Sequence, residues 1–304
     1  MQKRTLTYLK RFWLLVVALL LFVVLAACTG AGVLVLPVVS DYMPDEIVEI
    51  KDLRIGVVSG PYWDMFNEAI LPSLTEMGYT ATFVYYYDYA SPNFALAQNE
   101  VDINIFQHYA YLNTFKLEND LALSAIMEIP TISMSIFSNR FSSLDEIAPG
   151  TTASIPDDVS NLARALKVLE SANLIALCPS IDKSRAVLTD ITYNPYDLQI
   201  VPVPAHKLVE SLDEFCISVI PGNFAVSNNL NLAQALYREL LSANYFIVAV
   251  VRTEDLNKQF VRDIIDIIYS ENFRDIITDP TGDYALFQWP RWLHDAVSGA
   301  LRSK

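Results

Sequence analysis

From residue 50 onward, short β-rich runs alternate with segments of helical hydrophobic periodicity. The run 53–58 ends in the turn Ser59-Gly60-Pro61, and apolar residues then recur at helical spacing over 62–77, where Gly78 is positioned to end a helix. Further strands are predicted at 81–86, 102–106, 152–156, 198–203, 217–220 and 246–251, and further helices at 91–99, 110–117, 161–171, 205–212 and 254–269. This alternation predicts an α/β fold with largely parallel sheets.

The chain shows neither an internal repeat nor a linker long enough to separate two independent domains. We therefore expect two interleaved α/β lobes joined by two crossings, one near 137–139 and one after Gly222-Asn223. Lobe 1 would comprise 50–137 together with 240–304, and lobe 2 would comprise 138–239. Because ligands of such sheets bind outside the carboxyl ends of strands, residues that directly follow strands are the site candidates.

The N-terminal residues have the pattern of a targeting signal. Basic residues lie within 3–11, and an uncharged apolar run follows over 12–39. Within it, Leu25-Ala26-Ala27-Cys28 resembles the bacterial lipobox, which implies a signal peptide at 1–27, lipidation of Cys28 and a tether at 28–49. The alternative is an uncleaved signal anchor, since the run is long enough to span a bilayer. Both place the body outside the cytoplasmic membrane and attached to it.

Composition narrows the classes of function. The 304 residues include 21 Lys+Arg and 35 Asp+Glu, for a formal charge of −14, and such an acidic protein would be repelled by nucleic-acid phosphates. The 3 His have no metal-ligand spacing, and we find neither a nucleophile elbow nor a glycine-rich phosphate loop. We therefore predict no catalytic residue, metal or cofactor. Cys178 and Cys216 are either a disulfide pair or two free thiols.

Four segments after predicted strands carry side chains suited to a zwitterion: 86–93, 104–111, 156–164 and 221–224. Arginine can grip a carboxylate with a two-donor fork, amide oxygens accept from an ammonium group, and aromatic faces accommodate an apolar or thioether chain. Each candidate also has a simpler interpretation. Arg164 could be a surface ion-pair partner, the tyrosines at 85–87 ordinary strand surface, and His108 a structural imidazole.

The motifs in these segments resemble one known family. Asp88-Tyr89-x2-Pro92-Asn93-x-Ala95-Leu96 is followed by Asp102-x-Asn104-x-Phe106-Gln107-His108-x2-Tyr111-Leu112, then by Ile155-Pro156-x-Asp158-x-Ser160-Asn161-x2-Arg164-Ala165-Leu166 and by Gly222-Asn223-Phe224-Ala225. Their order and spacing, with the preceding lipobox, are similar to those of the NlpA-type methionine-binding lipoproteins. The resemblance covers roughly 53–277.

The resemblance implies the substrate-binding component of a methionine ABC importer, with a two-lobed periplasmic-binding-protein-like fold (type II-like) and a ligand cleft between the lobes. It implies that Arg164 holds the ligand carboxylate and that Asn223 and Asn104 hold the amino group or the carboxylate. Tyr89, Phe106, His108 and Tyr111 would line the side-chain pocket. The expected partners are a small amino acid, with methionine favoured, the permease, and the membrane through Cys28.

Several positions depart from the family pattern. Pro221 replaces an Asn, Tyr109-Ala110 replace a Lys-Pro-type pair, Tyr87 replaces a small residue, and Cys216 replaces an Asp. Because bulk at Tyr87 would narrow the pocket, the expected ligand is a small amino acid or a derivative. An enzyme or a ligand-sensing receptor on the same fold is the alternative.

The tail after residue 287 carries one apolar face at helical spacing, which begins after Pro290. We expect this helix to pack on the first lobe. Contact with the membrane interface, suggested by Trp289 and Trp292, is the alternative.

Overall fold

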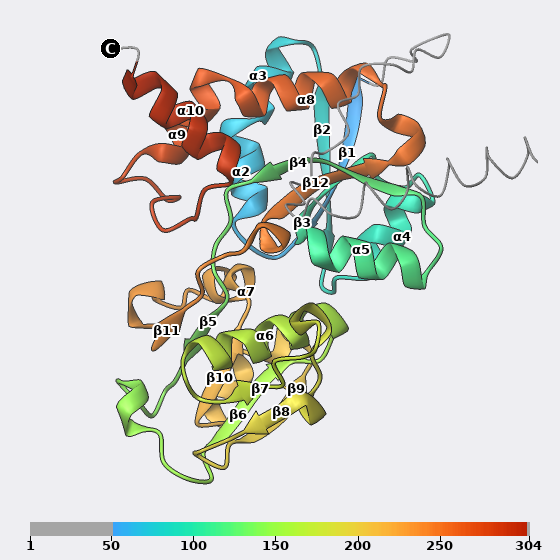
Figure 1. Cartoon of the computed structure of the whole chain (residues 1–304). Helices are drawn as coiled ribbons and strands as arrows, with labels where there is room; N and C mark the ends of the chain where they lie inside the picture. Colours follow the sequence, from blue (N-terminus) through green and yellow to red (C-terminus); the bar gives the residue numbers. More distant parts are fainter. Residues whose placement is uncertain (1–50, 303–304) are drawn as a thin grey trace, which may run out of the picture. The chain divides into compact units, whose positions relative to one another are not determined.

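The structure is a computed structural model that describes residues 51–302. The predicted signal peptide, the lipidation site Cys28 and the tether lie outside these residues. Two five-stranded sheets organise the described chain (Figure 1). The first sheet has the order β2-β1-β3-β12-β4, formed by Thr80–Tyr86, Asp52–Val58, Ile103–His108, Ile247–Arg252 and Leu123–Ile129. The second has the order β11-β5-β10-β6-β9, formed by Tyr237–Arg238, Ser135–Phe137, Ile217–Ile220, Thr152–Pro156 and Gln199–Val203.

Both sheets are mixed, whereas the sequence predicted largely parallel ones. In the first sheet β1 is parallel to β2 and β3, but β12 is antiparallel to both β3 and β4. In the second sheet β6 is parallel to β9 and β10, but β5 and β11 run antiparallel to their neighbours. The antiparallel strands lie beside the two crossings between the lobes, with β4 and β5 on either side of one and β11 and β12 on either side of the other. Parallel neighbours need a helical crossover within one lobe, whereas these strands enter their sheet from the other lobe.

The crossings differ from the expected positions. The chain leaves the first sheet after β4 and enters the second at β5, so the outgoing crossing is 130–134 and precedes the expected 137–139. The return crossing is 239–246, between β11 and β12, and not directly after Gly222-Asn223. Strand β5 therefore belongs to the second sheet, although the sequence placed it in lobe 1. The hydrophobic pattern also failed to predict β4, β5, β11 and the small two-stranded sheet of β7 (Ala176–Leu177) and β8 (Ile191–Tyr193).

The helix expected over 62–77 is divided into α2 (Tyr62–Ala69) and α3 (Leu71–Glu76). Pro72 explains the division, because it has no amide N–H to donate to the Glu68 carbonyl and is instead accommodated in the first turn of α3. Ile70 adopts φ −119° at the junction. Gly78 has φ +86°, a left-handed conformation that ends α3 as predicted.

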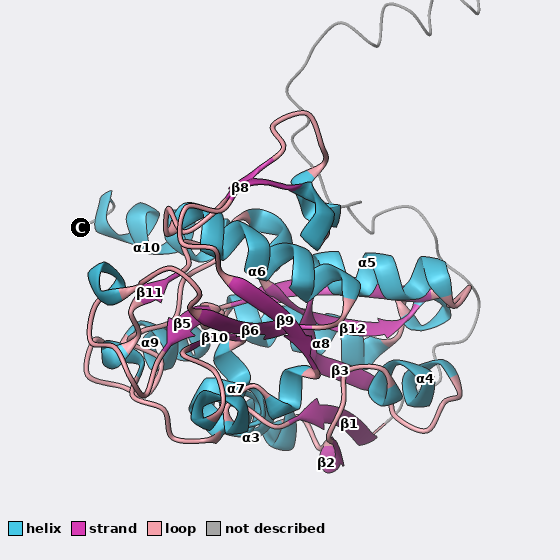
Figure 2. Ribbon diagram, turned by 90° about the horizontal axis from the view of Figure 1, so that it is seen from below, coloured by secondary structure: helices cyan, strands magenta, loops and turns pink. Residues whose placement is uncertain are grey.

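The remaining helices cover the sheets. Around the first sheet lie α4 (Ser91–Ala97), α5 (Tyr109–Glu118), α8 (Gln259–Tyr269) and α9 (Glu271–Thr278). In the second lobe α6 (Val159–Ser171) lies across the sheet, and α7 (Gly222–Ser227) follows β10 (Figure 2). The helix predicted at 205–212 is instead two short 3-10 turns, Ala205–Lys207 and Glu210–Asp213. The helix predicted at 254–269 begins only at Gln259, after the 3-10 turn Thr253–Asp255.

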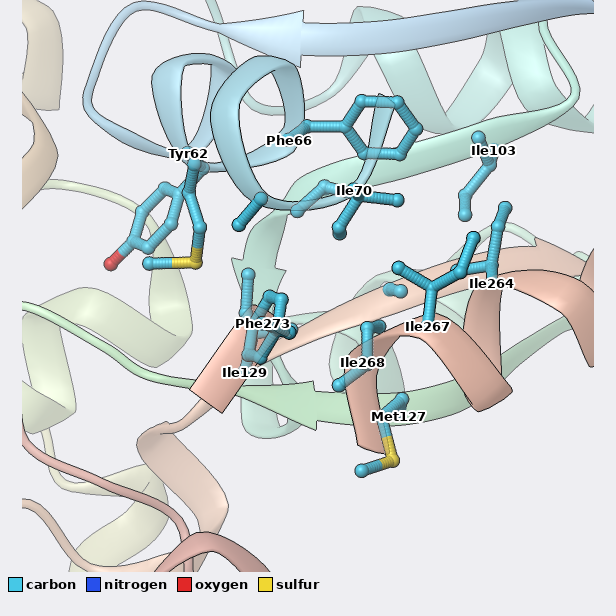
Figure 3. Close-up of a cluster of buried hydrophobic side chains, with 14 of the residues drawn as sticks. Tyr62, Phe66, Ile70, Ile103, Met127, Ile129, Ile264, Ile267, Ile268 and Phe273 are labelled. Carbon is cyan, nitrogen blue, oxygen red and sulfur yellow. The ribbon is translucent and has the colours of Figure 1, made fainter. Parts of the chain in front are cut away.

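The core of the first lobe lies between its sheet and helices α2, α3, α8 and α9 (Figure 3). Phe66, Ile264 and Phe273 are fully buried there. The tail forms α10 (Arg291–Arg302), which packs on this core as predicted, with Leu293 fully buried and Trp292 Nε1 donating to the Glu128 carbonyl at 2.9 Å. Among residues 51–302, none of the helices combines the length and apolar character needed to cross a bilayer.

Candidate functional site

A cavity lies where the two lobes and the crossings meet. Six of the seven residues predicted to bind a ligand border it: Arg164, Asn223, His108, Tyr111, Tyr89 and Phe106. The space open to the centre of a water molecule is only about 20 Å³. A single water needs roughly 10–15 Å³ by this measure, so the lobes are nearly closed on one another.

One side of the cavity is an aromatic wall. The Tyr89 ring stacks on Phe106 with centroids 6.0 Å apart and meets Tyr111 edge-on at 5.7 Å. The ring centroid of Phe224 lies 5.4 Å from that of Tyr89. Such a wall favours an apolar, aromatic or thioether side chain, because sulfur and CH groups make favourable contacts with ring edges and faces.

Arg164 is the one charged residue among those that border the cavity within the described chain. It projects from α6, is 4% exposed, and packs under the Tyr245 ring with its Cζ atom 4.9 Å from the centroid. Its Nε donates to both Glu239 carboxylate oxygens at 3.1 and 3.0 Å, and its Nη2 donates to Oε2 at 2.6 Å. Burial lowers the pKa of Arg164, but the Glu239 carboxylate raises it more, so the net change is upward.

This geometry rules out the surface ion-pair interpretation of Arg164. It also changes how the residue can bind a carboxylate, because Glu239 already occupies the fork formed by Nε and Nη2. Within residues 51–302, Nη1 makes no hydrogen bond. The edge that remains for a ligand is therefore the one formed by Nη1 and the second N–H of Nη2.

His108 both caps a helix and borders the cavity. Its Nδ1 accepts from the Tyr111 amide at 3.0 Å at the start of α5, which leaves Nε2 as the protonated nitrogen. Nε2 then donates to Asn161 Oδ1 at 3.0 Å, across the cleft on α6. Burial and the neighbouring Arg164 charge lower the pKa of His108 to about 3, so the imidazole is neutral.

A second hydrogen bond joins the lobes through Asn223. Tyr89 Oη donates to Asn223 Oδ1 at 2.9 Å, and Asn223 Nδ2 donates to the Ser59 carbonyl at 3.1 Å. Burial raises the pKa of Tyr89 well above its usual value, so its hydroxyl remains a donor. Gly60, at φ +146°, lets α7 approach this loop, because a Cβ at that position would lie 2.6 Å from Asn223 Cβ.

Asn104 does not border the cavity, contrary to the sequence prediction. Its side chain is fully buried on β3, where Nδ2 donates to the Pro92 carbonyl at 2.8 Å and to Asn93 Oδ1 at 3.2 Å. It lies two residues before Phe106 on the strand, about 6–7 Å further from the end that faces the cleft. Asn104 therefore supports the first turn of α4 and, in this arrangement, lies outside the cavity lining.

The departures from the family pattern affect the cavity less than expected. Tyr87 is 87% exposed and lies away from the cavity, so its bulk does not narrow it. Cys216 interacts with Thr152 and Arg140 at the start of β10, and both Cys216 and Cys178 are free thiols. Pro221 is the departure that does border the cavity.

Eight further residues border the cavity that the sequence did not assign to the ligand: Tyr62, Gln107, Thr131, Ile132, Asn161, Pro221, Gly222 and Ile247. Asn161 lay inside a quoted motif, and its position one turn before Arg164 could have placed it on the same helix face. Thr131 lies in the outgoing crossing and Ile247 at the first residue after the return crossing, so both depend on the arrangement of the lobes. Local pattern carries no signal for such positions.

Comparison with known proteins identifies the family. The profile of the NlpA lipoproteins matches residues 53–289. The chain belongs to the NlpA lipoprotein family. It is 30% identical over 222 residues to outer membrane lipoprotein 3 of Mannheimia haemolytica, covering 73% of this chain and 84% of that protein. It is also 30% identical over 233 residues to the methionine-binding lipoprotein MetQ of Bacillus subtilis, covering 75% and 84%.

Solved structures of NlpA-like proteins share the fold. A nutrient-binding protein from Burkholderia cenocepacia bound to methionine is 26% identical, with a TM-score of 0.70 and coverage of 75% of this chain and 95% of that one. The NlpA family consists of substrate-binding proteins and not enzymes. Over 51–302, no group of three or more His, Cys, Asp or Glu side chains is arranged to hold a metal ion.

Proposed function

We propose that this protein captures methionine, or a closely related small amino acid, outside the cytoplasmic membrane and delivers it to an ABC transporter permease. The observation that carries the proposal is a buried arginine that borders the same cavity as an aromatic wall. That pairing matches a ligand with a carboxylate at one end and a thioether at the other.

Each bordering residue has a role in this proposal. Arg164 donates two N–H groups from its free edge to the ligand carboxylate, and the carbonyl of the Asn223 side chain accepts from the ammonium group. Tyr89, Phe106, His108 and Tyr111 surround the ligand side chain. A neutral His108 suits this arrangement, because an imidazolium would repel the ammonium group and Arg164.

Delivery requires the two lobes to open and close. The cavity is too small for an amino acid as the lobes stand, so uptake needs the crossings 130–134 and 239–246 to move. A permease would then recognise the closed, loaded form. Attachment through lipidated Cys28, as the family name and the lipobox suggest, would hold the protein near that permease, and an uncleaved signal anchor would do the same.

Titration calorimetry with L-methionine tests the proposal. Arg164→Ala is a poor probe, because it would leave the buried Glu239 carboxylate without its cation. Arg164→Lys retains the charge but loses the two-donor geometry, so we expect methionine affinity to fall at least tenfold. Arg140→Lys is the matched control, since Arg140 is an exposed arginine in the second lobe away from the cavity.

Two outcomes would overturn the proposal. One is the absence of binding to L-methionine, D-methionine and the other small amino acids by the wild-type chain. The other is an Arg164→Lys variant that binds methionine as tightly as the Arg140→Lys control.

A further inference from the structure

Glu239 connects the ligand anchor to both crossings. It lies in the return crossing, where its amide donates to the Met134 carbonyl at 3.0 Å and its Oε2 accepts from the Met134 amide at 3.3 Å. Gln288 also contacts both crossings, because its Nε2 donates to the Glu239 carbonyl at 2.7 Å and to Ser133 Oγ at 2.6 Å. The Glu239 carboxylate is therefore held by the Met134 amide on one side and by the guanidinium of Arg164 on the other, while the Glu239 backbone is tied to Met134 and Gln288.

Glu239 also balances the charge of the site. It does not border the cavity, and its side chain is 10% exposed behind Arg164. Within the described chain, the residues that border the cavity include a cation but no carboxylate. A bound ligand would therefore contact Arg164 directly, whereas the Glu239 carboxylate would lie a few ångströms further from the ligand.

We propose that Glu239 sets the charge selectivity of the cavity, so that a zwitterion is preferred over an anion of the same shape; this rests on the proposed function. Arg164 alone would attract any carboxylate. The fixed Glu239 charge repels the net-anionic ligand, whereas the ammonium group of an amino acid offsets that repulsion.

Coulomb's law gives the size of the effect. A carboxylate on the free edge of Arg164 would lie about 6 Å from the Glu239 carboxylate, and the ligand ammonium about 9 Å from it. At an effective dielectric constant of about 20, the repulsion between the two carboxylates would weaken ligand binding about 100-fold. The attraction between the ligand ammonium and the Glu239 carboxylate would strengthen it about 20-fold. For a zwitterion the two partly cancel and leave a net weakening of about fivefold, whereas an anion or a cation experiences only one of them.

The experiment compares three ligands that share one side chain: methionine, its analogue without the amino group, and its analogue without the carboxyl group. Affinities are measured by calorimetry for the wild type, Glu239→Gln, Glu239→Asp and Glu170→Gln. Glu170 is the matched control, because it lies on α6 as Arg164 does, forms an ion pair with Lys183, and lies away from the cavity.

We expect Glu239→Gln to lower the preference for methionine over the deamino analogue about 20-fold, which is the contribution of the ammonium group. It should raise the preference for methionine over the decarboxy analogue by tenfold or more. Glu239→Asp and Glu170→Gln should leave both ratios within about twofold of the wild type.

If Glu239→Gln changes all three affinities by the same factor, Glu239 has only a structural role and the proposal is wrong. Circular dichroism checks whether Glu239→Gln folds. If it does not, Glu239→Ser is the second neutral replacement, since its smaller side chain leaves room for water beside Arg164. Affinity ratios in Glu239→Ser that equal those of the wild type would also refute the proposal. Failure of the wild type to bind methionine would instead contradict the proposed function, so the two failures are distinguishable.

Discussion

The buried imidazole of His108 predicts that acid destabilises this protein over a defined range of pH. In the folded state the pKa of His108 is about 3, against an ordinary value of 6.5. Between these values the unfolded chain binds a proton that the folded chain does not, so protonation favours unfolding. Stability from this group is therefore present above about pH 6.5 and is lost progressively as the pH falls toward 3.

The magnitude follows from the difference between the two pKa values. Between about pH 7.5 and about pH 5, the linkage relation gives a loss of about 2 kcal/mol in the free energy of unfolding. The loss would approach about 5 kcal/mol below pH 3, where carboxylates also titrate. The range between about pH 7.5 and about pH 5 is the better one for the measurement, because it lies above the ordinary pKa values of Asp and Glu.

Urea denaturation at the two pH values measures this loss. The test variant is His108→Gln, which cannot take up a proton but retains an amide donor for Asn161. We expect the wild type to lose about 2 kcal/mol more than this variant between the two pH values. His206→Gln is the control, since His206 is exposed in the turn Ala205–Lys207, and it should behave as the wild type does.

Equal losses in the wild type and His108→Gln would refute the reasoning. Such a result would mean that solvent reaches the imidazole in the ligand-free protein. The lobes would then be separated in solution, and the bond between His108 and Asn161 would form only in a closed state.

Two other predictions concern the tail and the packing of the first sheet. Deletion of 289–304 should lower the melting temperature, because it exposes the surface that Leu293 covers and removes the Trp292–Glu128 hydrogen bond. The affinity for methionine should stay within a few-fold of the wild type. An unchanged melting temperature together with lost liposome binding would favour the membrane alternative. Gly56→Ala should cost about 1–3 kcal/mol in urea denaturation, because its Cβ would collide with Asn104 Oδ1, whereas Gly299→Ala meets no neighbour and should be neutral or slightly stabilising.

Local sequence rules were sufficient where the determining interaction is itself local. Asp158 caps α6 by accepting from the Asn161 amide at 3.0 Å, and an aspartate directly before an apolar helical stripe is a local signal for such a cap. The same rules located the strand ends that face the cleft, because a buried strand followed by polar residues is a pattern within one segment. The division of α2 from α3 was not predicted, although Pro72 is a local signal for it, because the hydrophobic periodicity continues across the junction.

The missed features depend on residues far apart in the chain. Glu239 is 75 positions from Arg164, and nothing near either residue indicates that they pair. Strand β4 lacks a clear alternation of exposed and buried positions, since β12 and α8 determine what it buries. Asn104 was assigned to the ligand by motif alone, and only the packing beneath Gly56 shows that it faces the interior.

The bonds across the cleft and the ties at the crossings together constrain how a ligand can enter. Tyr89–Asn223 and His108–Asn161 must both break before the cavity admits an amino acid, and each is a hydrogen bond worth about 1 kcal/mol net. Gln288 bridges both crossings through Thr131, Ser133 and Glu239, so the two segments bend together and not independently. A carboxylate that binds Arg164 therefore acts on a residue already held by the return crossing. Under the proposed function, binding and closure would for this reason be coupled through one ion pair, and a change at Glu239 would alter both.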